Sequence, residues 1–319
     1  MERITLVGAA GTLGPWVASA LTGSTVRAVG RSAAGLQRAF GREAGIEQRV
    51  WNPDDPASVR AAVRGTDTLI YLVGVDYWRF HLHPQLARAT LAGAVAEGVR
   101  RIVLVGTVYP YGDTGSTPLR EDQPRRPHTF KGRMRLEQEQ VLEQAQAEGA
   151  IELAIVRLPD FFGPGADKSF LHGAVRAAVR GGRADVVGPI DLPHQFVCLP
   201  DAGRVVAQVA RTPAAFGKSW HFAGSGSTTQ AALLSLLEQE IGHPLPRRIV
   251  GKTMLRVAGL FSPMLRELVE MHYLITNPVF LDDSALQGLL GHLPRTGYRE
   301  GMRDWLAAER AAAGLALAA

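Results

Sequence analysis

The residues near the N-terminus that are best suited to chemistry form a short glycine-rich loop. The segment Gly8-Ala9-Ala10-Gly11-Thr12-Leu13-Gly14 has the spacing GxxGxxG, follows an apolar run at residues 4–7 and opens a helical pattern at residues 12–21. Glycines at this spacing allow a tight turn, close backbone approach to a ligand and close helix–strand packing, and the helix start attracts an anion. The loop therefore predicts a dinucleotide site contacted by Gly8, Gly11, Thr12, Leu13 and Gly14, the alternative being a glycine-rich turn without a ligand.

A second feature bears on which dinucleotide this loop would hold. The next predicted strand ends in Val29-Gly30-Arg31-Ser32 and carries no carboxylate. Sites that prefer NAD usually place an acidic residue here, on the ribose 2′-hydroxyl. A guanidinium can instead pair with a 2′-phosphate, and a serine hydroxyl can add a hydrogen bond. Arg31 and Ser32 thus favour NADP(H) over NAD(H), although a solvated arginine in a turn is the alternative.

The elements that must position these residues alternate between short apolar runs and helical patterns. Strands are expected at residues 4–7, 25–29, 46–51, 68–73 and 102–105, with helices at 33–40 and 84–97 among those between them. Nearly continuous apolar runs separated by helices are typical of parallel strands covered on both faces. The pattern predicts an α/β fold with a doubly wound, Rossmann-type parallel sheet.

The second half of the chain has a different character. Glycine- and proline-rich turns interrupt shorter elements beyond Gly163-Pro164-Gly165. Helices are expected at 201–210, with Asp201 as N-cap, and at 229–241, 252–272, 282–290 and 298–312. We expect a nucleotide-binding domain at 1–165 and a smaller α/β substrate lobe at 166–319, with segments near 196–223 returning to the main domain.

Composition narrows the functional classes. The 319 residues include 46% hydrophobic and 20% charged residues, and the net charge of +5 does not favour a nucleic-acid partner. Cys198 is the only cysteine, so a disulfide within the chain is impossible and a cytoplasmic protein is expected. No uninterrupted apolar stretch is long enough for a membrane span, so no membrane partner is expected.

Taken together, these segments resemble the short-chain dehydrogenase/reductase superfamily, in its extended and atypical NAD(P)-dependent epimerase/dehydratase-like branch. Besides the glycine loop, the resemblance rests on residues 67–74, 103–107, Tyr111-Gly112, 156–164 and 196–201, and it covers most of the chain. It implies that Val73 and Gly74 lie along the cofactor, that Leu158 and Pro159 approach the nicotinamide, and that Asn52 lies in the adenine-contacting region.

The resemblance also implies a catalytic hydroxyl and a Tyr-x-x-x-Lys pair on one helix. Thr107 stands at the expected hydroxyl position. The helix that should carry the pair begins near Pro127 and places Phe130 on the tyrosine and Met134 on the lysine. A phenyl ring donates no proton and a thioether carries no charge, so the usual pair is absent. Shifting the register to make Lys131 the lysine leaves Pro127 on the tyrosine.

Four residues are candidates to replace the missing pair. Lys131 can reach the ribose or the nicotinamide from the same helix start, Tyr109 or Tyr111 can supply a phenol, and His128 can act as an acid near neutral pH. Each of them also has a structural interpretation. We take Thr107, Lys131 and Tyr109 as the candidate catalytic residues, with Thr107 and Lys131 also contacting the cofactor.

Other polar clusters carry weaker signals. His81 and His83 lack the carboxylate pair or cysteine that would complete a metal site, so no metal is expected. His194 and Gln195 lie in a segment that closes the substrate site in relatives. A basic run is formed by Arg125, Arg126, Lys131, Arg133 and Arg135, which either attracts a phosphorylated substrate or forms a solvated helix face.

Two functions are consistent with these residues. The first is an NADP(H)-dependent oxidoreductase or epimerase-like enzyme acting on a small carbonyl, alcohol or sugar-like substrate. The second is a non-catalytic NADP(H)-binding redox sensor or regulator, which the missing Tyr-x-x-x-Lys pair favours. A small molecule is the expected partner of either, and a homodimer is a further candidate assembly.

Overall fold

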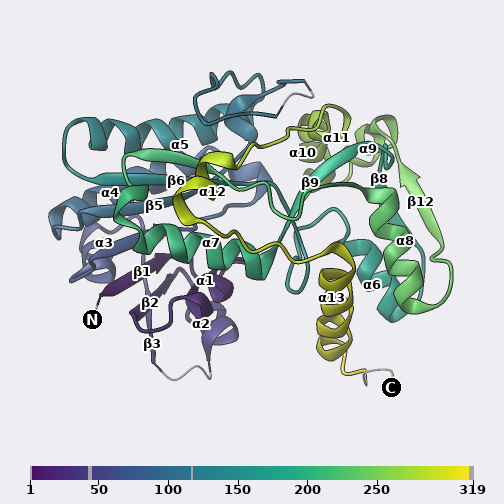
Figure 1. The fold of residues 1–319 in the computed structure, drawn as a ribbon, viewed down its shortest axis with the longest axis horizontal. Helices are drawn as coiled ribbons and strands as arrows, with labels where there is room; N and C mark the ends of the chain where they lie inside the picture. The colour runs from purple at the N-terminus through teal and green to yellow at the C-terminus, as the bar shows by residue number, and fades with distance from the viewer. Residues whose placement is uncertain (1, 42–44, 116–117, 316–319) are drawn as a thin grey trace.

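A computed structural model describes residues 2–41, 45–115 and 118–315. Its centre is a seven-stranded parallel sheet with the order β10-β6-β5-β4-β1-β2-β3 (Figure 1). The strands are β1 (Arg3–Val7), β2 (Thr25–Gly30), β3 (Ile46–Val50), β4 (Thr68–Tyr71), β5 (Arg101–Thr107), β6 (Glu152–Leu158) and β10 (Lys218–His221). The predicted doubly wound α/β fold is confirmed.

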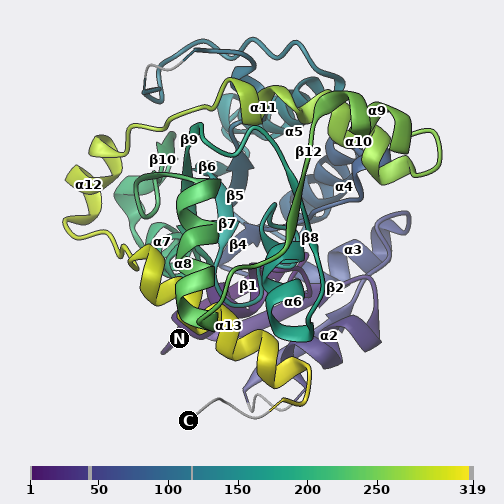
Figure 2. The same cartoon turned by 90° about the vertical axis from the view of Figure 1, so that its right-hand side faces the viewer.

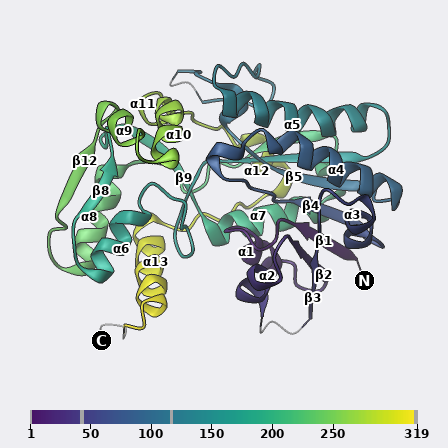
Figure 3. The ribbon, with the colours of Figure 1, turned by 180° about the vertical axis from the view of Figure 1, so that it is seen from behind.

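Helices cover both faces of this sheet, because its central strands are apolar on both sides. One face packs on α1 (Gly14–Ala20), α2 (Ala33–Phe40) and α7 (Leu199–Arg211), and the other on α3 (Pro56–Val63), α4 (Leu82–Ala96) and α5 (Phe130–Ala147). The short 3-10 turns η1 (Tyr77–Arg79) and η2 (Tyr109–Tyr111) follow β4 and β5. Seen from behind, α4 and α5 again lie on one side of the strands and α1 and α7 on the other (Figure 3).

Residues beyond the middle of the chain build a smaller lobe beside the sheet (Figure 1). The lobe contains two small sheets, with the strand orders β11-β9-β7 and β12-β8. The lobe comprises β7 (Asp160–Phe162), α6 (His172–Arg180), β8 (Ala184–Val187), β9 (Pro193–Cys198), β11 (Ser227–Thr229), α8 (Gln230–Ile241), β12 (Arg247–Val250), α9 (Lys252–Ala258), α10 (Pro263–Met271), α11 (Tyr273–Thr276) and α13 (Tyr298–Ala312). Helix α12 (Ser284–Leu290) instead packs near β10 of the main sheet. A further 3-10 turn, η3 (Pro213–Ala215), precedes β10.

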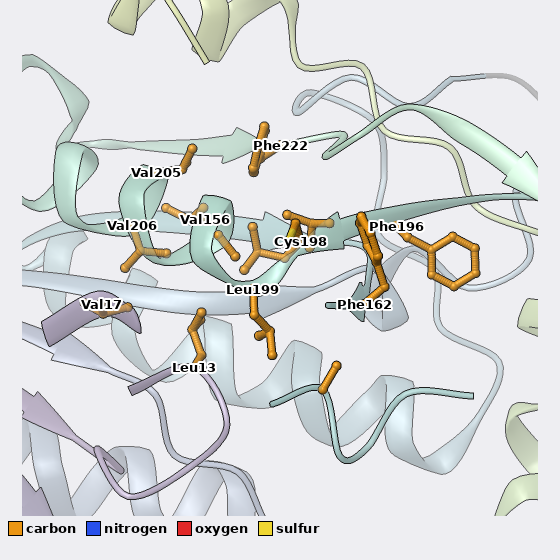
Figure 4. Packing of buried hydrophobic residues seen from close by; sticks show 14 of the residues in the cluster. Leu13, Val17, Val156, Phe162, Phe196, Cys198, Leu199, Val205, Val206 and Phe222 are labelled. Carbon is orange, nitrogen blue, oxygen red and sulfur yellow. The ribbon is translucent and has the colours of Figure 1, made fainter. Parts of the chain in front are cut away.

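Two later segments nevertheless return to the main sheet: β10 is one of its strands, and α7 covers one of its faces. Strand β10 pairs with β6, and α7 packs against α1. One hydrophobic core continues from the sheet into the smaller lobe, and Figure 4 shows Val156, Leu199 and Leu13 in the same apolar layer. Cys198 is buried in this core. The start of α1 is therefore anchored by residues from both halves of the chain.

Two expected elements differ from the structure. The helix expected at 252–272 is divided into α9 and α10, because Pro263 has no amide hydrogen and disfavours helical geometry at the residue before it. Asp201 does not cap α7, which begins at Leu199 with Cys198 as N-cap. Its carboxylate instead accepts a hydrogen bond from the Thr296 amide at 2.6 Å and pairs with Arg204.

Candidate functional site

The glycine loop lies at the carboxyl end of β1 and is shaped by backbone contacts. Gly8 has φ +86°, and a Cβ there would lie 2.8 Å from Val73 Cα. A Cβ on Gly14 would lie 1.8 Å from the carbonyl oxygen of Ala9, so neither position admits a side chain. Gly11 is exposed at the rim of the loop. The loop thus forms a cradle of main-chain atoms that suits a diphosphate.

The strand that follows places Arg31 and Ser32 beside this cradle. Arg31 is exposed directly after β2, and the Ser32 hydroxyl oxygen caps α2 by accepting from the Gly35 amide at 3.2 Å. A Cβ on Gly35 would lie 3.6 Å from the Cβ atoms of both Ala10 and Ser32, which shows how close the two segments are. The arrangement leaves the Arg31 guanidinium free to reach a ligand next to the loop.

Three other expected cofactor contacts, Val73, Gly74 and Asn52, lie at or just beyond neighbouring strand ends. Gly74 is exposed just after β4, and the backbone of Val73 lies against Gly8. Asn52 is exposed beyond β3, but it is engaged in a local turn. The backbone amide of Asn52 donates to the Ser58 hydroxyl at 2.9 Å, and its side-chain Oδ1 accepts from the backbone amide of Asp54 at 3.1 Å.

Thr107 ends β5 at the same edge of the sheet. It is directly opposite Leu158 in the parallel register, so Thr107, Leu158 and Pro159 lie together. The Tyr109 amide donates to Thr107 Oγ1 at 3.3 Å, and the Tyr109 hydroxyl lies 2.9 Å from that of Tyr77. Burial raises the pKa of Tyr109 well above its usual range, helped by the Tyr77 phenol and Asp160. Tyr109 is therefore a neutral hydrogen-bonding group here.

The other two phenol and imidazole candidates lie apart from this group. The Tyr111 hydroxyl lies 2.7 Å from Nε2 of the buried His221, and burial raises the pKa of Tyr111 to about 12. The His221 Nδ1 contacts the Leu119 carbonyl at 3.0 Å, so Tyr111 is bound into the core. His128 is exposed and packs edge-on against Tyr273, with ring centroids 4.5 Å apart.

Helix α5 turns a different pair of residues inward from the pair expected. Phe130 is the first residue of α5 and is 43% exposed, whereas Lys131 and Arg135 are buried on the inner face one turn apart. The Arg135 guanidinium donates to the Val105 carbonyl at 3.0 Å and contacts His83 Nδ1 at 3.3 Å. Lys131 and Arg135, which are four residues apart like the expected tyrosine and lysine, are therefore both cationic residues. The sequence placed Arg135 only in a basic run, and the structure shows that it is buried.

Helix α10 covers Lys131 and the start of α5. Lys131 Nζ donates to Glu270 Oε2 at 2.5 Å and to Glu267, and lies 5.8 Å from the centre of the Tyr77 ring. The other carboxylate oxygen of Glu270 accepts from the amides of Phe130 and Lys131 at 2.5 and 3.2 Å, at the start of α5. We call these contacts of Glu267 and Glu270 with the start of α5 the clamp.

Asp160 is a titratable group of this region that the sequence did not single out. Burial raises its pKa to about 6, while the neighbouring His194 opposes the shift. His194 is buried, and its two ring nitrogens lie 3.0 Å from the carbonyl oxygens of Leu192 and Leu274. Gln195 exchanges two hydrogen bonds with the backbone of Leu281. His194 and Gln195 are thus held by backbone groups.

Little free space remains between these elements. A cavity of about 10 Å³ lies between Tyr77, Tyr109 and α10, and its walls are mostly apolar. A larger cavity of about 370 Å³ lies beside α5, next to Arg125 and Arg157. Arg125 pairs there with Glu139 and Glu143, so the basic run is not simply a solvated face.

Two absences can be stated for the described part of the chain. No helix in it combines the length and apolar character needed to cross a membrane. Within the same residues, no group of three or more histidine, cysteine, aspartate or glutamate side chains is placed to hold a metal ion.

The fold and the glycine cradle define a dinucleotide-binding protein of the Rossmann type, and a family model gives the family. Residues 4–222 match the NAD dependent epimerase/dehydratase family, so the chain belongs to that family. The resemblance to the epimerase/dehydratase-like branch is thereby confirmed. No curated protein matches the sequence.

Solved structures share the whole fold at low sequence identity. UDP-glucuronic acid 4-epimerase from Bacillus cereus, in complex with UDP-glucuronic acid and NAD, superposes with a TM-score of 0.81 at 15% identity over 98% of this chain and 100% of that chain. dTDP-glucose 4,6-dehydratase from Streptomyces venezuelae, with NAD bound, gives 0.81 at 18% identity over 98% of both chains. UDP-glucose 4-epimerase from Thermotoga maritima, with UDP-glucose, gives 0.79 at 17% identity over 98% and 100%.

Proposed function

We propose that the chain is an NAD(P)-dependent oxidoreductase or epimerase-like enzyme acting on a carbonyl or alcohol, with a nucleotide-linked sugar as the favoured substrate class. The observation that carries this proposal is the glycine cradle at the same carboxyl edge of the sheet as Thr107, in a member of this family. The nicotinamide of a bound dinucleotide supplies hydride chemistry. The nucleotide sugars and NAD of the similar solved structures support the substrate class.

The cofactor contacts follow from the strand ends described above. We assign the diphosphate to the loop of Gly8, Gly11, Thr12, Leu13 and Gly14, and the adenosine end to Arg31, Ser32 and Asn52. Val73, Gly74, Leu158 and Pro159 flank the remainder. The exposed guanidinium of Arg31, with no carboxylate at the end of β2, favours NADP(H) over NAD(H).

Three side chains are assigned to the reacting end. The Thr107 hydroxyl orients the substrate oxygen, and Tyr109 supports Thr107 through its own amide. Lys131 supplies the proton or stabilises negative charge on that oxygen once Glu267 and Glu270 release it. We further propose that residues 1–165 and 166–319 divide cofactor and substrate binding between them.

Calorimetric titration with NADP⁺, NADPH, NAD⁺ and NADH tests the cofactor half of the proposal. We expect NADPH to bind at least about tenfold more tightly than NADH, and Arg31→Glu to abolish that preference. Arg38→Glu, at an exposed arginine on α2, is the matched control. Absence of affinity for all four dinucleotides overturns the proposal, and an unchanged preference in Arg31→Glu overturns the role of Arg31.

Turnover tests the chemical half. Purified protein with NADPH, NADH and the oxidised forms is assayed against simple aldehydes and ketones and against UDP- and dTDP-hexoses. We expect turnover that falls about 100-fold in Thr107→Ala and in Lys131→Met.

The clamp favours a second function, a redox sensor that binds the dinucleotide without turnover. With Lys131 wholly buried under α10 and little cavity beside Tyr109, a bound cofactor meets no substrate. Such a sensor binds tightly, distinguishes oxidised from reduced cofactor and shows no turnover on any panel member. Turnover that disappears in Thr107→Ala excludes it.

A further inference from the structure

Helix α9 and the turn that joins it to α10 carry a cluster of exposed apolar side chains. Met254, Val257, Leu260 and Phe261, which we call the tip, are 43%, 57%, 80% and 88% exposed. The two helices that carry the tip stand at the edge of the molecule (Figure 2). Clusters of large apolar side chains in water usually mark an interaction surface.

Backbone contacts fix the tip in this exposed position. The amides of Gly259, Leu260 and Phe261 donate to carbonyls three or four residues earlier, at 2.8, 3.2 and 3.1 Å. A Cβ on Gly259 would lie 2.9 Å from Arg266 Cα, so α9 and α10 are in close contact here. Leu255, which is 1% exposed, already packs the inner side of α9 into the core. The tip is therefore a second apolar face, and folding does not need it.

The charges around the tip are basic. Lys252 and Arg256 are exposed on α9, one turn apart, and the Arg266 side chain is 68% exposed on α10. Glu267 and Glu270 on α10 bind Lys131, and a Glu267 oxygen also lies 4.0 Å from the Arg266 guanidinium, so the positive charge beside the tip comes mainly from Lys252 and Arg256. The outer surface of the hairpin thus combines protruding apolar groups with positive charge.

We propose that the tip docks on an anionic lipid surface, with Leu260 and Phe261 entering the headgroup boundary and Lys252, Arg256 and Arg266 facing lipid phosphates and carboxylates. This combination is typical of interfacial membrane binding, which requires no spanning helix. A second copy of the chain fits less well, because a twofold contact at the tip would bring its arginines and lysine against their own copies. The few apolar side chains of the tip are also too little surface for a stable dimer.

The docking is independent of the proposed enzyme activity, and lipid binding measures it directly. Full-length protein is sedimented with vesicles made of equal parts phosphatidylcholine and phosphatidylserine, and with vesicles of phosphatidylcholine alone. We expect binding to the first at least about tenfold tighter, weakening with added salt. Leu260→Ser with Phe261→Ser, and separately Lys252→Glu with Arg256→Glu, each reduce it at least about tenfold.

Matched controls separate the tip from general stickiness. Val50→Ser with Val95→Ser removes exposed apolar side chains elsewhere and should leave vesicle binding unchanged. Phe261→Cys labelled with an environment-sensitive fluorophore should shift to shorter wavelength with anionic vesicles, while labelled Val95→Cys does not. The native Cys198 is 2% exposed and should not compete for label.

The opposite results overturn the proposal. Equal binding to both vesicle types, equal binding by the tip variants, or no binding at all rejects an anionic lipid partner. Sedimentation velocity that shows a dimer lost in Leu260→Ser with Phe261→Ser, without vesicle binding, assigns the tip to a second copy instead.

Discussion

The two ends of the candidate site are built in different ways. The glycine loop is made of backbone, and the positions without side chains are enforced by contacts with Ala9 and Val73. The reacting end is made of side chains, and one of them, Lys131, has its partners about 140 residues later, on α10. A backbone site is therefore inherited with the fold, whereas a side-chain site can change its chemistry while the fold stays intact. Four experiments test this contrast.

The largest effect is expected at Gly14. A methyl group there overlaps the Ala9 carbonyl, so Gly14→Ala should reduce the free energy of unfolding by about 3 kcal/mol or more. Gly74→Ala is the control, because a Cβ there meets no atom within 4 Å. Chemical denaturation measures both. A Gly14→Ala protein as stable as Gly74→Ala would show that the loop is not fixed by its backbone contacts.

The second largest effect on stability is expected from breaking the clamp. Lys131→Met leaves two carboxylates facing an apolar side chain, and we expect a loss of about 3 kcal/mol in the free energy of unfolding. Hydrogen exchange in α10 should increase at the same time. Arg133→Met, at an exposed residue of the same helix, should change the free energy of unfolding by no more than about 0.5 kcal/mol and should leave hydrogen exchange in α10 unchanged. Equal effects from the two substitutions contradict the clamp.

The register of α5 can be tested by restoring the family's pair. Lys131→Tyr with Arg135→Lys puts a phenol and an ammonium on the buried face of α5, and turnover of a suitable carbonyl should rise at least about 100-fold above the single variants. Phe130→Tyr with Met134→Lys is the matched control in the register expected from sequence. Gain only in the control would show that the inward face is not the reacting face.

A smaller effect concerns pH. The pKa of Asp160 is raised by burial to about 6, above its ordinary value of 3.8. The folded state then binds a proton that the unfolded state has released, so this group makes stability fall as pH rises from about 4 to 6. Asp160→Asn should remove that slope. Urea titrations of both proteins across this range measure it, and parallel curves contradict the assignment.

The sequence predicts the glycine loop better than the reacting end. The glycine loop, Arg31 and the strand pattern are local signals, and the structure places the loop and Arg31 side by side as the fold class requires. The contacts of Lys131 with Glu267 and Glu270 leave no local signal, since they join distant segments. The sequence places Phe130 and Met134 at the positions of the family's pair, whereas the structure buries Lys131 and Arg135, whose polar side chains give no sign of burial in the sequence.

The boundary between α9 and α10 shows a different limit. Pro263 lies inside the single helix that is expected at residues 252–272. The local backbone rule for proline divides that helix into two. Asp201 failed as an N-cap for the opposite reason, because a tertiary partner, the Thr296 amide, binds its carboxylate.

The shared core has a consequence for dissecting the molecule. Helix α7 and strand β10 come from residues 199–211 and 218–221, yet they complete the sheet and cover Leu13, Val17 and Val156. A fragment that stops at residue 165 would present these side chains and the outer edge of β6 to water. We expect such a truncated polypeptide to aggregate rather than fold as an autonomous nucleotide-binding unit.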